Sequence, residues 1–238
     1  TCALPILAAG GFRGRRLKHL FTGAGEDKAV AGVESLLPDG MIGAMLELRI
    51  QQHFIDSADL QYQLSETLAK PVDAAVQALL ASLTGGGKIL VAGLGTSFTL
   101  AQYFSGLLLG GFERDRPGLA AITLVQDVLC APVATAEEVL ARQVHALGMG
   151  GDVLVLISAA GDEPALARAA LAAHARDMTV LALTGGSGGA LARQLRETDV
   201  HVCVPHERIA RVRELQQLVL HCLCDGIDAQ LLGEQEPM

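Results

Sequence analysis

Two glycine-containing turns carry the side chains in this sequence that are best suited to hold an anion. The first follows an apolar run and contributes four candidate ligand-binding residues: Gly93, Gly95, Thr96 and Ser97. Glycines let the backbone approach an anion closely, and hydroxyl groups add donors at the positive end of a helix dipole. Such a turn is equally typical of a tight strand-to-helix connection in which Thr96 or Ser97 is the N-cap.

The second turn also follows an apolar run and contributes Ser158 and Gly161 as candidate ligand-binding residues. Asp162 and Glu163 come next, directly before Pro164, and proline is a favoured first residue of a helix. Two carboxylates at a helix N-terminus repel a phosphate that would otherwise take the backbone donors there. We expect these acids to cap and charge the helix start rather than to take part in catalysis.

Two single residues are further candidates. Asp127 follows the strand expected at residues 120–125, where it could contact a sugar or cap the following turn. His221 lies on the last predicted helix, with Glu214 and Asp225 one or two turns away, and this pattern favours a helix-surface histidine. The other histidines show no spacing that is typical of a metal site.

A sheet is needed to position these turns. Apolar runs alternate with helical patterns along the chain, as they do in a parallel sheet with helices on both faces. The five expected strands cover residues 88–92, 120–125, 153–158, 179–183 and 200–204. The sequence therefore predicts a doubly wound five-stranded α/β domain, in which ligands bind where strands end and helices begin.

Further helices are expected before and after this alternating region. Leu46 begins an apolar pattern of helical period and Pro71 opens a second, so we predict a pair of helices before the sheet. A long helix with an apolar stripe is predicted from about residue 208 to residue 232. Residues 1–40 are rich in glycine and have no sustained period, so we expect a poorly ordered extension before a domain at 41–238.

Composition and charge exclude several classes of function. The 238 residues have an apolar share of 50%, enough for a buried core, and a formal net charge of -8, which repels nucleic acids. The aromatic residues are too few and scattered to form a base-stacking platform. No stretch is long enough to span a membrane, and the five cysteines fit neither a zinc knuckle nor a redox pair, so we expect reduced thiols in the cytoplasm.

Several motifs follow one another at a spacing that resembles one family. They are residues 93–97 (GLGTS), 101–104 (AQYF), 112–117 (FERDRP), 183–185 (LTG) and 211–214 (RVRE). On these motifs the chain is similar to sugar isomerase (SIS) domain proteins, namely bacterial phosphoheptose isomerases and DnaA initiator-associating proteins. The latter have a Cys-Leu-Cys-Asp run like that of residues 222–225. The resemblance covers about residues 45–232 and implies the same SIS-type sheet.

The resemblance also implies an isomerase site, from which this sequence departs. The family isomerises sedoheptulose 7-phosphate with a glutamate on the helix after the first turn and a histidine on the last helix, often beside zinc. Leu107 stands at the glutamate position and Tyr103 at that of a metal-binding histidine. Arg213, a candidate ligand-binding residue, replaces a glutamine ligand, and His221 matches the catalytic histidine. A leucine cannot shuttle the proton that isomerisation must move.

The second turn departs from the family as well. The family reads Ser-Thr-Ser-Gly-Asn-Ser there, and this chain keeps only Ser158 and Gly161. Asp162 and Glu163 replace the last two polar residues, so we expect phosphate to bind less well here than in the family.

These departures favour a catalytically degenerate SIS protein that acts by binding. The expected ligand is a sugar phosphate or a related anion, and the resemblance implies the replication initiator as protein partner and a homotetramer as assembly. Zinc is common in the family, but most of its ligands are absent here, so we expect no cofactor. From the charge and composition given above, we expect no direct contact with nucleic acid or with a membrane. The alternative is an active isomerase of heptose and lipopolysaccharide biosynthesis that uses Tyr103, His221 or Asp127 in altered roles.

Overall fold

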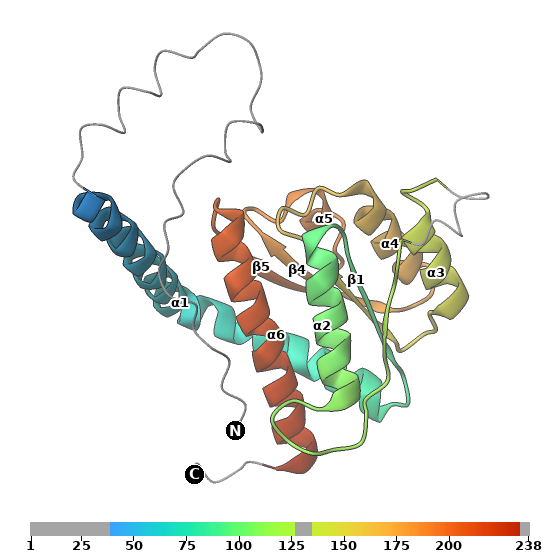
Figure 1. Cartoon of the computed structure of the whole chain (residues 1–238). Coiled ribbons are helices and arrows are strands. Elements are labelled where there is room, and N and C mark those ends of the chain that lie inside the picture. Colours follow the sequence, from blue (N-terminus) through green and yellow to red (C-terminus); the bar gives the residue numbers. More distant parts are fainter. Residues whose placement is uncertain (1–38, 127–134, 234–238) are drawn as a thin grey trace, which may run out of the picture. The chain divides into compact units, whose positions relative to one another are not determined.

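The computed structural model describes residues 39–126 and 135–233 of the chain (Figure 1). The chain divides into two compact units, residues 1–52 and residues 53–238. The second unit holds the sheet and the helices around it, while the described part of the first is the start of helix α1. None of the helices in the two described ranges is long and apolar enough to cross a membrane. The extension predicted at residues 1–40 lies outside the described residues up to position 38.

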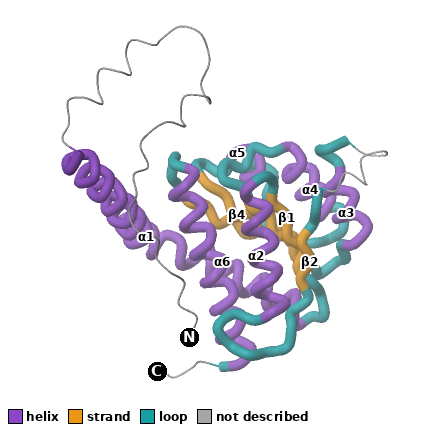
Figure 2. The backbone as a smooth tube through the Cα atoms, viewed as in Figure 1, coloured by secondary structure: helices purple, strands orange, loops and turns teal. Residues whose placement is uncertain are grey.

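Five parallel strands form one sheet in the order β2-β1-β3-β4-β5 (Figure 2). The chain first adds β2 on one side of β1 and then crosses back to add β3 on the other, which makes the sheet doubly wound. The strands are β1 (Ile89–Gly93), β2 (Ala121–Thr123), β3 (Val153–Ile157), β4 (Thr179–Gly185) and β5 (Val200–Val204). Each overlaps a predicted strand, and the predicted fold class is confirmed.

Helices pack on both faces of the sheet, which explains why the strands read as continuous apolar runs. Ile89 and Val91 of β1 belong to one core cluster, and Leu90 and Ala92 belong to the other, because alternate strand residues point to opposite faces. The first cluster includes side chains of α1, α2 (Thr96–Gly110) and α6 (Ile209–Leu232). The second includes side chains of α3 (Val139–Leu147), α4 (Pro164–His174) and α5 (Gly189–Ala192).

The predicted pair of N-terminal helices is wrong, because one continuous helix, α1 (Asp39–Thr84), covers both. Pro71 lies inside this helix. Proline removes one helical hydrogen bond and crowds the carbonyl four residues earlier, which often ends a helix. Here Leu68 before the proline and Ala75 and Leu79 after it are buried in the core, and this burial outweighs the lost bond.

A buried ion pair ties the segment after α2 to α6. Arg116 Nε donates to Asp228 Oδ1 at 2.5 Å, and each side chain is 1% exposed. The Arg116 guanidinium also donates to the carbonyls of Leu107 and Leu108 and so helps to cap the last turn of α2. Burial, together with the nearby Asp228 carboxylate, raises the pKa of the Cys224 thiol to about 12. This thiol therefore stays protonated at neutral pH.

Candidate functional site

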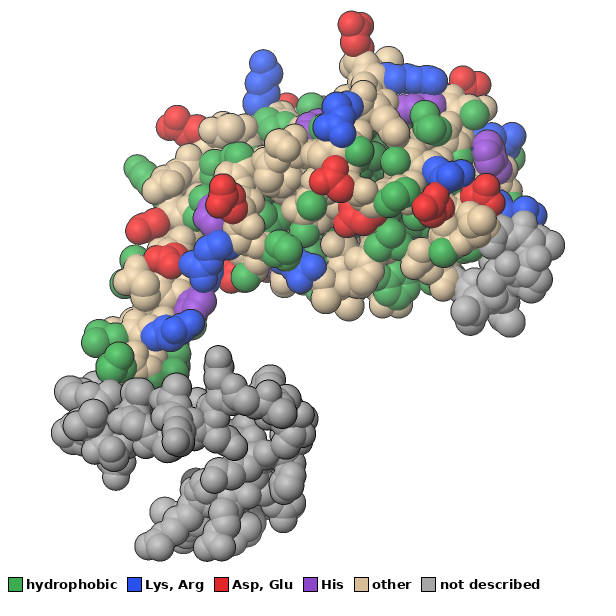
Figure 3. Space-filling view, turned by 90° about the horizontal axis from the view of Figure 1, so that it is seen from above, with side chains coloured by type: hydrophobic (Ala, Val, Ile, Leu, Met, Phe, Trp, Pro, Cys, Tyr) green, Lys and Arg blue, Asp and Glu red, His purple; other side chains and the backbone are tan. Residues whose placement is uncertain are grey.

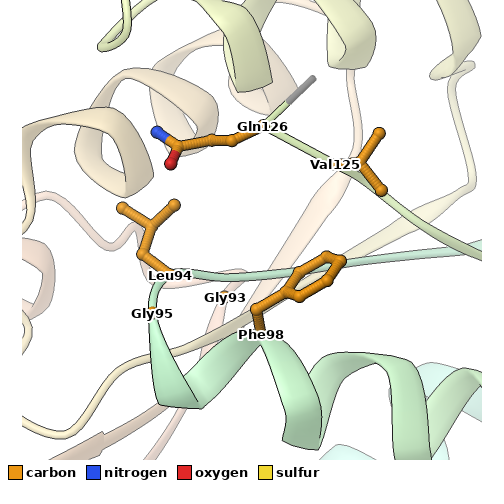
Figure 4. Close-up of a pocket in the computed structure, with 6 residues that line it drawn as sticks. All are labelled: Gly93, Leu94, Gly95, Phe98, Val125 and Gln126. Carbon is orange, nitrogen blue, oxygen red and sulfur yellow. The ribbon is translucent and has the colours of Figure 1, made fainter. Parts of the chain in front are cut away.

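A cavity of about 500 Å³ lies where β1 ends and α2 begins. It is lined by Gly93, Leu94, Gly95, Phe98, Val125 and Gln126. Figure 4 shows the side chains of Leu94, in the first turn, and Phe98, in α2, directed towards Val125 and Gln126, which lie two and three residues after the end of β2. This is the carboxyl end of the sheet, where doubly wound proteins bind ligands, and the volume suits a small molecule.

Glycine is required at two positions of the first turn. A Cβ on Gly93 would lie 2.4 Å from the Ser97 carbonyl oxygen, so any side chain would displace the first turn of α2. Gly95 is the N-cap of α2 and has a φ of 55°, a value that L-residues rarely adopt. No side chain caps this helix, so the prediction that Thr96 or Ser97 is the N-cap is wrong. Gly95 takes the cap position itself, which places both hydroxyls inside the helix.

The two hydroxyl residues of the first turn do not line the cavity, although both neighbours in sequence do. Thr96 is exposed and Ser97 is 2% exposed, and neither is among the described residues that line the cavity. The prediction for Asp127 lies outside the described residues. Leu94 and Phe98 were not predicted, because apolar residues beside a turn carry no chemical signal in the sequence. The structure therefore confirms the position of the first turn but assigns the cavity walls to other side chains.

The second turn, residues 158–163, is folded around the hydroxyl of Ser158. That oxygen accepts the backbone N–H of Gly161 at 2.6 Å and that of Ala160 at 3.2 Å, and its own proton goes to Glu163 Oε2 at 2.5 Å. Ser158 is fully buried. A hydroxyl has one donor and two acceptor positions, so all of its hydrogen-bonding capacity is used inside the turn.

The prediction that the carboxylates of this turn cap helix α4 is wrong. Glu163 occupies the N-cap position, but its side chain makes no capping bond because its carboxylate accepts the Ser158 proton instead. Asp162 Oδ1 accepts the backbone N–H of Ala190 at 2.9 Å. The two acids therefore fix the turn itself, Glu163 to the end of β3 and Asp162 to the start of α5.

Contacts from two further elements hold the second turn in place. Gly161 has a φ of 82°, and a Cβ there would lie 2.1 Å from the Gly188 carbonyl oxygen. Its own carbonyl accepts the N–H of Leu191 at 2.8 Å. Gln216 of α6 is fully buried and donates to the Ser158 carbonyl at 2.7 Å and to a β4 carbonyl at 3.2 Å. Gln216 was not predicted, since one glutamine beside an apolar stripe of the sequence gives no sign of a distant partner.

A cluster of three rings joins α2 to α6. Tyr103 Oη and His221 Nε2 lie 2.7 Å apart, and the Phe112 ring stacks on His221 with centroids 5.4 Å apart. His221 is therefore half-buried between the two helices, not on an open helix surface as its neighbours in sequence suggested. The sequence could not reveal this contact, because both ring partners come from a segment about a hundred residues earlier.

The ring cluster is separated from the first turn along α2. Tyr103 comes seven residues after Thr96, which corresponds to about 10 Å along a helix that rises 1.5 Å per residue. Arg213 precedes His221 by about two turns of α6 and is half-buried. Its Nε is buried and has no partner among the described residues. The candidate residues thus form three groups: the cavity, the second turn, and the rings with Arg213 on the same helix.

The ring cluster does not fit a zinc ion. Leu107 has no ligating atom, the guanidinium of Arg213 is cationic, and Tyr103 already bonds the His221 Nε2 that would bind metal. Within residues 39–126 and 135–233, no three His, Cys, Asp or Glu side chains are grouped so that they could hold a metal ion.

The molecular surface above the sheet carries both signs of charge. Figure 3, the view from above relative to Figure 1, shows Lys and Arg side chains interspersed with Asp and Glu across this face. Opposite charges in close alternation weaken the long-range field that attracts polyanions. The described part of the visible face therefore carries no single-sign patch of charge.

Proteins of known family match this chain in sequence and in fold over most of its length. The SIS domain family matches residues 52–185. A phosphoheptose isomerase from Methylibium petroleiphilum is 52% identical over 199 residues, 81% of this chain and 98% of that protein. The DnaA initiator-associating protein of Yersinia pseudotuberculosis is 43% identical over 196 residues, 81% of this chain and all of that protein. The solved phosphoheptose isomerase of Neisseria gonorrhoeae is 38% identical and has a TM-score of 0.72, covering 77% of this chain and 99% of its own. The chain therefore belongs to the SIS domain family, in the group of phosphoheptose isomerases and DnaA initiator-associating proteins.

Proposed function

We propose that this chain is a binding member of its family without effective isomerase chemistry, and that its protein partner is the replication initiator. One observation carries the first half of the proposal. At the ring cluster, His221 faces the phenol of Tyr103 at 2.7 Å, and Leu107 stands where the family has its glutamate. No carboxylate therefore accompanies the histidine at these positions.

Ketose–aldose isomerisation needs one group to take a proton from carbon and another to deliver one to oxygen. His221 Nε2 and Tyr103 Oη are within hydrogen-bond distance, so each is engaged with the other until one of them moves. The pair consists of one imidazole and one phenol, and no carboxylate at position 107 joins them. The imidazole would therefore have to work without the second proton-transfer group that the glutamate position supplies in the family.

The second half of the proposal is supported by the relatives. One of them, at 43% identity and full coverage of its own length, is named for its association with the DnaA initiator. In addition to binding the initiator, the chain could hold a sugar phosphate or a related anion, for which the cavity at the first turn provides space. We propose that the protein acts in the cytoplasm, the compartment expected from its sequence.

Turnover of sedoheptulose 7-phosphate tests the proposal. We expect the purified chain to act at least about 100-fold more slowly than the Neisseria gonorrhoeae enzyme assayed alongside, because general acid–base assistance contributes about 100- to 10,000-fold. Binding to the isolated N-terminal domain of the initiator should be measurable by calorimetry in the same preparation. Turnover within tenfold of the control enzyme would overturn the loss of catalysis, and absence of binding would remove the initiator as partner.

An active isomerase is the second candidate, favoured by the 52% identical relative and by the short Tyr103–His221 contact. In that case the phenol and the imidazole would exchange the substrate's protons between them. Replacing Tyr103 by phenylalanine distinguishes the candidates. It should abolish turnover if the pair is catalytic, and it should leave a negligible rate unchanged if the chain is a binding protein.

We also propose that the chain assembles as a homotetramer, because α1 exposes large apolar side chains. Phe54 is 75% exposed and Tyr62 is 84% exposed, and monomeric proteins rarely leave such groups in water together. Sedimentation at micromolar concentration should give a tetramer, and Phe54→Glu should shift it to smaller species. Leu171→Glu, at a 54% exposed leucine of α4, is the matched control and should leave assembly unchanged. A monodisperse wild-type monomer would refute the prediction.

A further inference from the structure

We infer that a second cavity, lined by residues of α1 and of the segment that leads into α6, binds a small zwitterion of the α-amino acid class. The ammonium group of the ligand faces Asp59, and its carboxylate faces His206 and Arg208. This site goes beyond the proposed function, because its described lining shares no residue with the cavity at the first turn.

The second cavity has a volume of about 260 Å³, and its lining residues all belong to the second compact unit. Pockets for drug-sized ligands occupy about 300 to 1,000 Å³, so this one suits a smaller molecule. Its described lining divides by charge between two segments of the chain. Helix α1 contributes two acids and no base: Asp56, Asp59, Leu60 and Gln63. The loop after β5 and the start of α6 contribute only basic side chains: His206, Arg208 and Arg211.

The acidic side of the cavity is one face of α1, since its residues follow the helical spacing i, i+3, i+4 and i+7. Asp56 Oδ2 pairs with Arg208 Nη1 at 3.3 Å, and this pair joins the two segments. Asp59, one turn further along, is exposed and has no hydrogen bond or ion pair with another described residue. Its negative charge is therefore available to a cationic group of a ligand.

The basic side of the cavity offers hydrogen-bond donors. The backbone N–H of Arg208 donates to His206 Nδ1 at 3.0 Å, so the neutral imidazole of His206 carries its proton on Nε2. No described residue accepts that proton. Arg208 uses one terminal nitrogen for Asp56, and its other N–H groups have no partner among the described residues. Both side chains can therefore donate to an acceptor of a ligand.

Arg211 adds a buried positive charge to the same side. Its side chain is 4% exposed, and its two terminal nitrogens contact Glu214 and His53. Its Nε has no partner among the described residues. A buried N–H of a cation is costly to leave unpaired, and a negative acceptor close to this guanidinium would offset part of that cost.

The separation of charge selects the ligand. An anion such as phosphate would be attracted by the two arginines and repelled by the two aspartates, and a simple cation would meet the reverse. A neutral polyol would leave both signs of charge without an opposite partner. A zwitterion places its ammonium against Asp59 and its carboxylate against His206 and Arg208. Leu60, which is half-buried, provides an apolar contact for a short alkyl side chain.

The test compares L-alanine with two molecules that each carry one of its charged groups, propionate and ethylamine. The backbone amide signals of residues 59–63 and 206–211 in the full chain are followed by NMR at fixed ionic strength. We expect L-alanine to bind at least about tenfold more tightly than either half, because each half lacks a hydrogen bond between charged groups. Glycerol and inorganic phosphate, as a neutral polyol and an anion, should bind as weakly as the halves.

Two variants separate the two ends of the ligand. Asp59→Asn keeps the size of the side chain and removes its charge, so the affinities for L-alanine and ethylamine should fall about tenfold while that for propionate does not fall. Arg208→Gln should weaken L-alanine and propionate but not ethylamine. Asp73→Asn, at an exposed aspartate of the same helix outside the cavity lining, is the matched control and should change none of the three affinities. Thermal unfolding of each variant confirms that it is folded.

The inference is overturned if L-alanine shifts neither set of amide signals, or if propionate, phosphate or glycerol binds there as tightly as L-alanine does. Equal losses in Asp59→Asn and Asp73→Asn would overturn it too, because they would indicate a general effect of charge. Neither turnover nor initiator binding enters these measurements. The proposed function and the zwitterion site can therefore fail separately.

Discussion

Replacing Leu107 by glutamate alone is expected to leave isomerase turnover near the wild-type level, although this substitution restores the family's carboxylate. The new carboxylate would have Tyr103 as its neighbour, where the family has a histidine. The Glu163 carboxylate would also remain in the second turn, where it repels the substrate phosphate. Adding Tyr103→His and Arg213→Gln with Asp162→Asn and Glu163→Ser should raise turnover by about 100-fold or more, the typical contribution of a general acid–base pair. The gain should be strongly non-additive, because binding and proton transfer are both needed.

Steady-state kinetics on the series separates the two defects. The pair of changes in the second turn should lower KM without changing kcat, and the changes at the rings should act on kcat. Leu107 is half-buried against the core, so thermal unfolding of each variant must accompany the kinetics. Full recovery from Leu107→Glu alone would show that the second turn does not obstruct the substrate.

Replacing Asp228 by alanine is expected to lower the free energy of unfolding by about 3 to 5 kcal/mol, because it leaves the Arg116 charge buried without its partner. Both side chains are 1% exposed, so the pair is isolated from water, and Asp228 Oδ2 has no hydrogen-bond partner among the described residues. For a chain of this size the melting temperature should fall by about 6 to 20 °C. Calorimetry or circular dichroism measures this directly.

An exposed pair on the same protein provides the control. Arg168 contacts Glu137 at 3.0 Å with both side chains about half exposed, and Glu137→Ala should cost less than about 1 kcal/mol. Replacing both Arg116 and Asp228 by leucine should cost less than Asp228→Ala alone if the unpaired charge dominates. Equal losses from Asp228→Ala and Glu137→Ala would contradict the assignment of the large effect to burial.

The sheet was predictable from the sequence because its strands are buried on both faces. A run such as residues 153–157 has no polar side chain to interrupt it, and glycines follow or end several of these runs. The break predicted at Pro71 was wrong for an equally physical reason. Local rules describe what proline does to an isolated helix, whereas Leu68 and Leu79 gain their stabilisation from contacts with distant parts of the chain.

The candidate site was predictable only as far as local sequence determines it. Both turns were found, because glycines and hydroxyl groups after apolar strands are visible in the sequence. The hydrogen-bond partner of Glu163 could not be predicted. A carboxylate before a helix can either cap the helix or bond back to the preceding strand, and only the three-dimensional structure shows which of the two occurs. The contacts of His221 with Tyr103 and Phe112 could not be predicted either. They depend on how α2 and α6 pack against each other, and the spacing of residues along one helix does not determine that packing.

The two edges of the sheet have a consequence for aggregation. An edge strand offers free backbone N–H and C=O groups to another chain and can seed intermolecular sheets. Here β2 is only three residues long, and Pro205, which has no N–H to offer, follows β5 directly. Strand addition between folded copies is therefore disfavoured at both edges, and concentrated solutions should resist growth into fibrils even though the chain is rich in β-branched apolar runs.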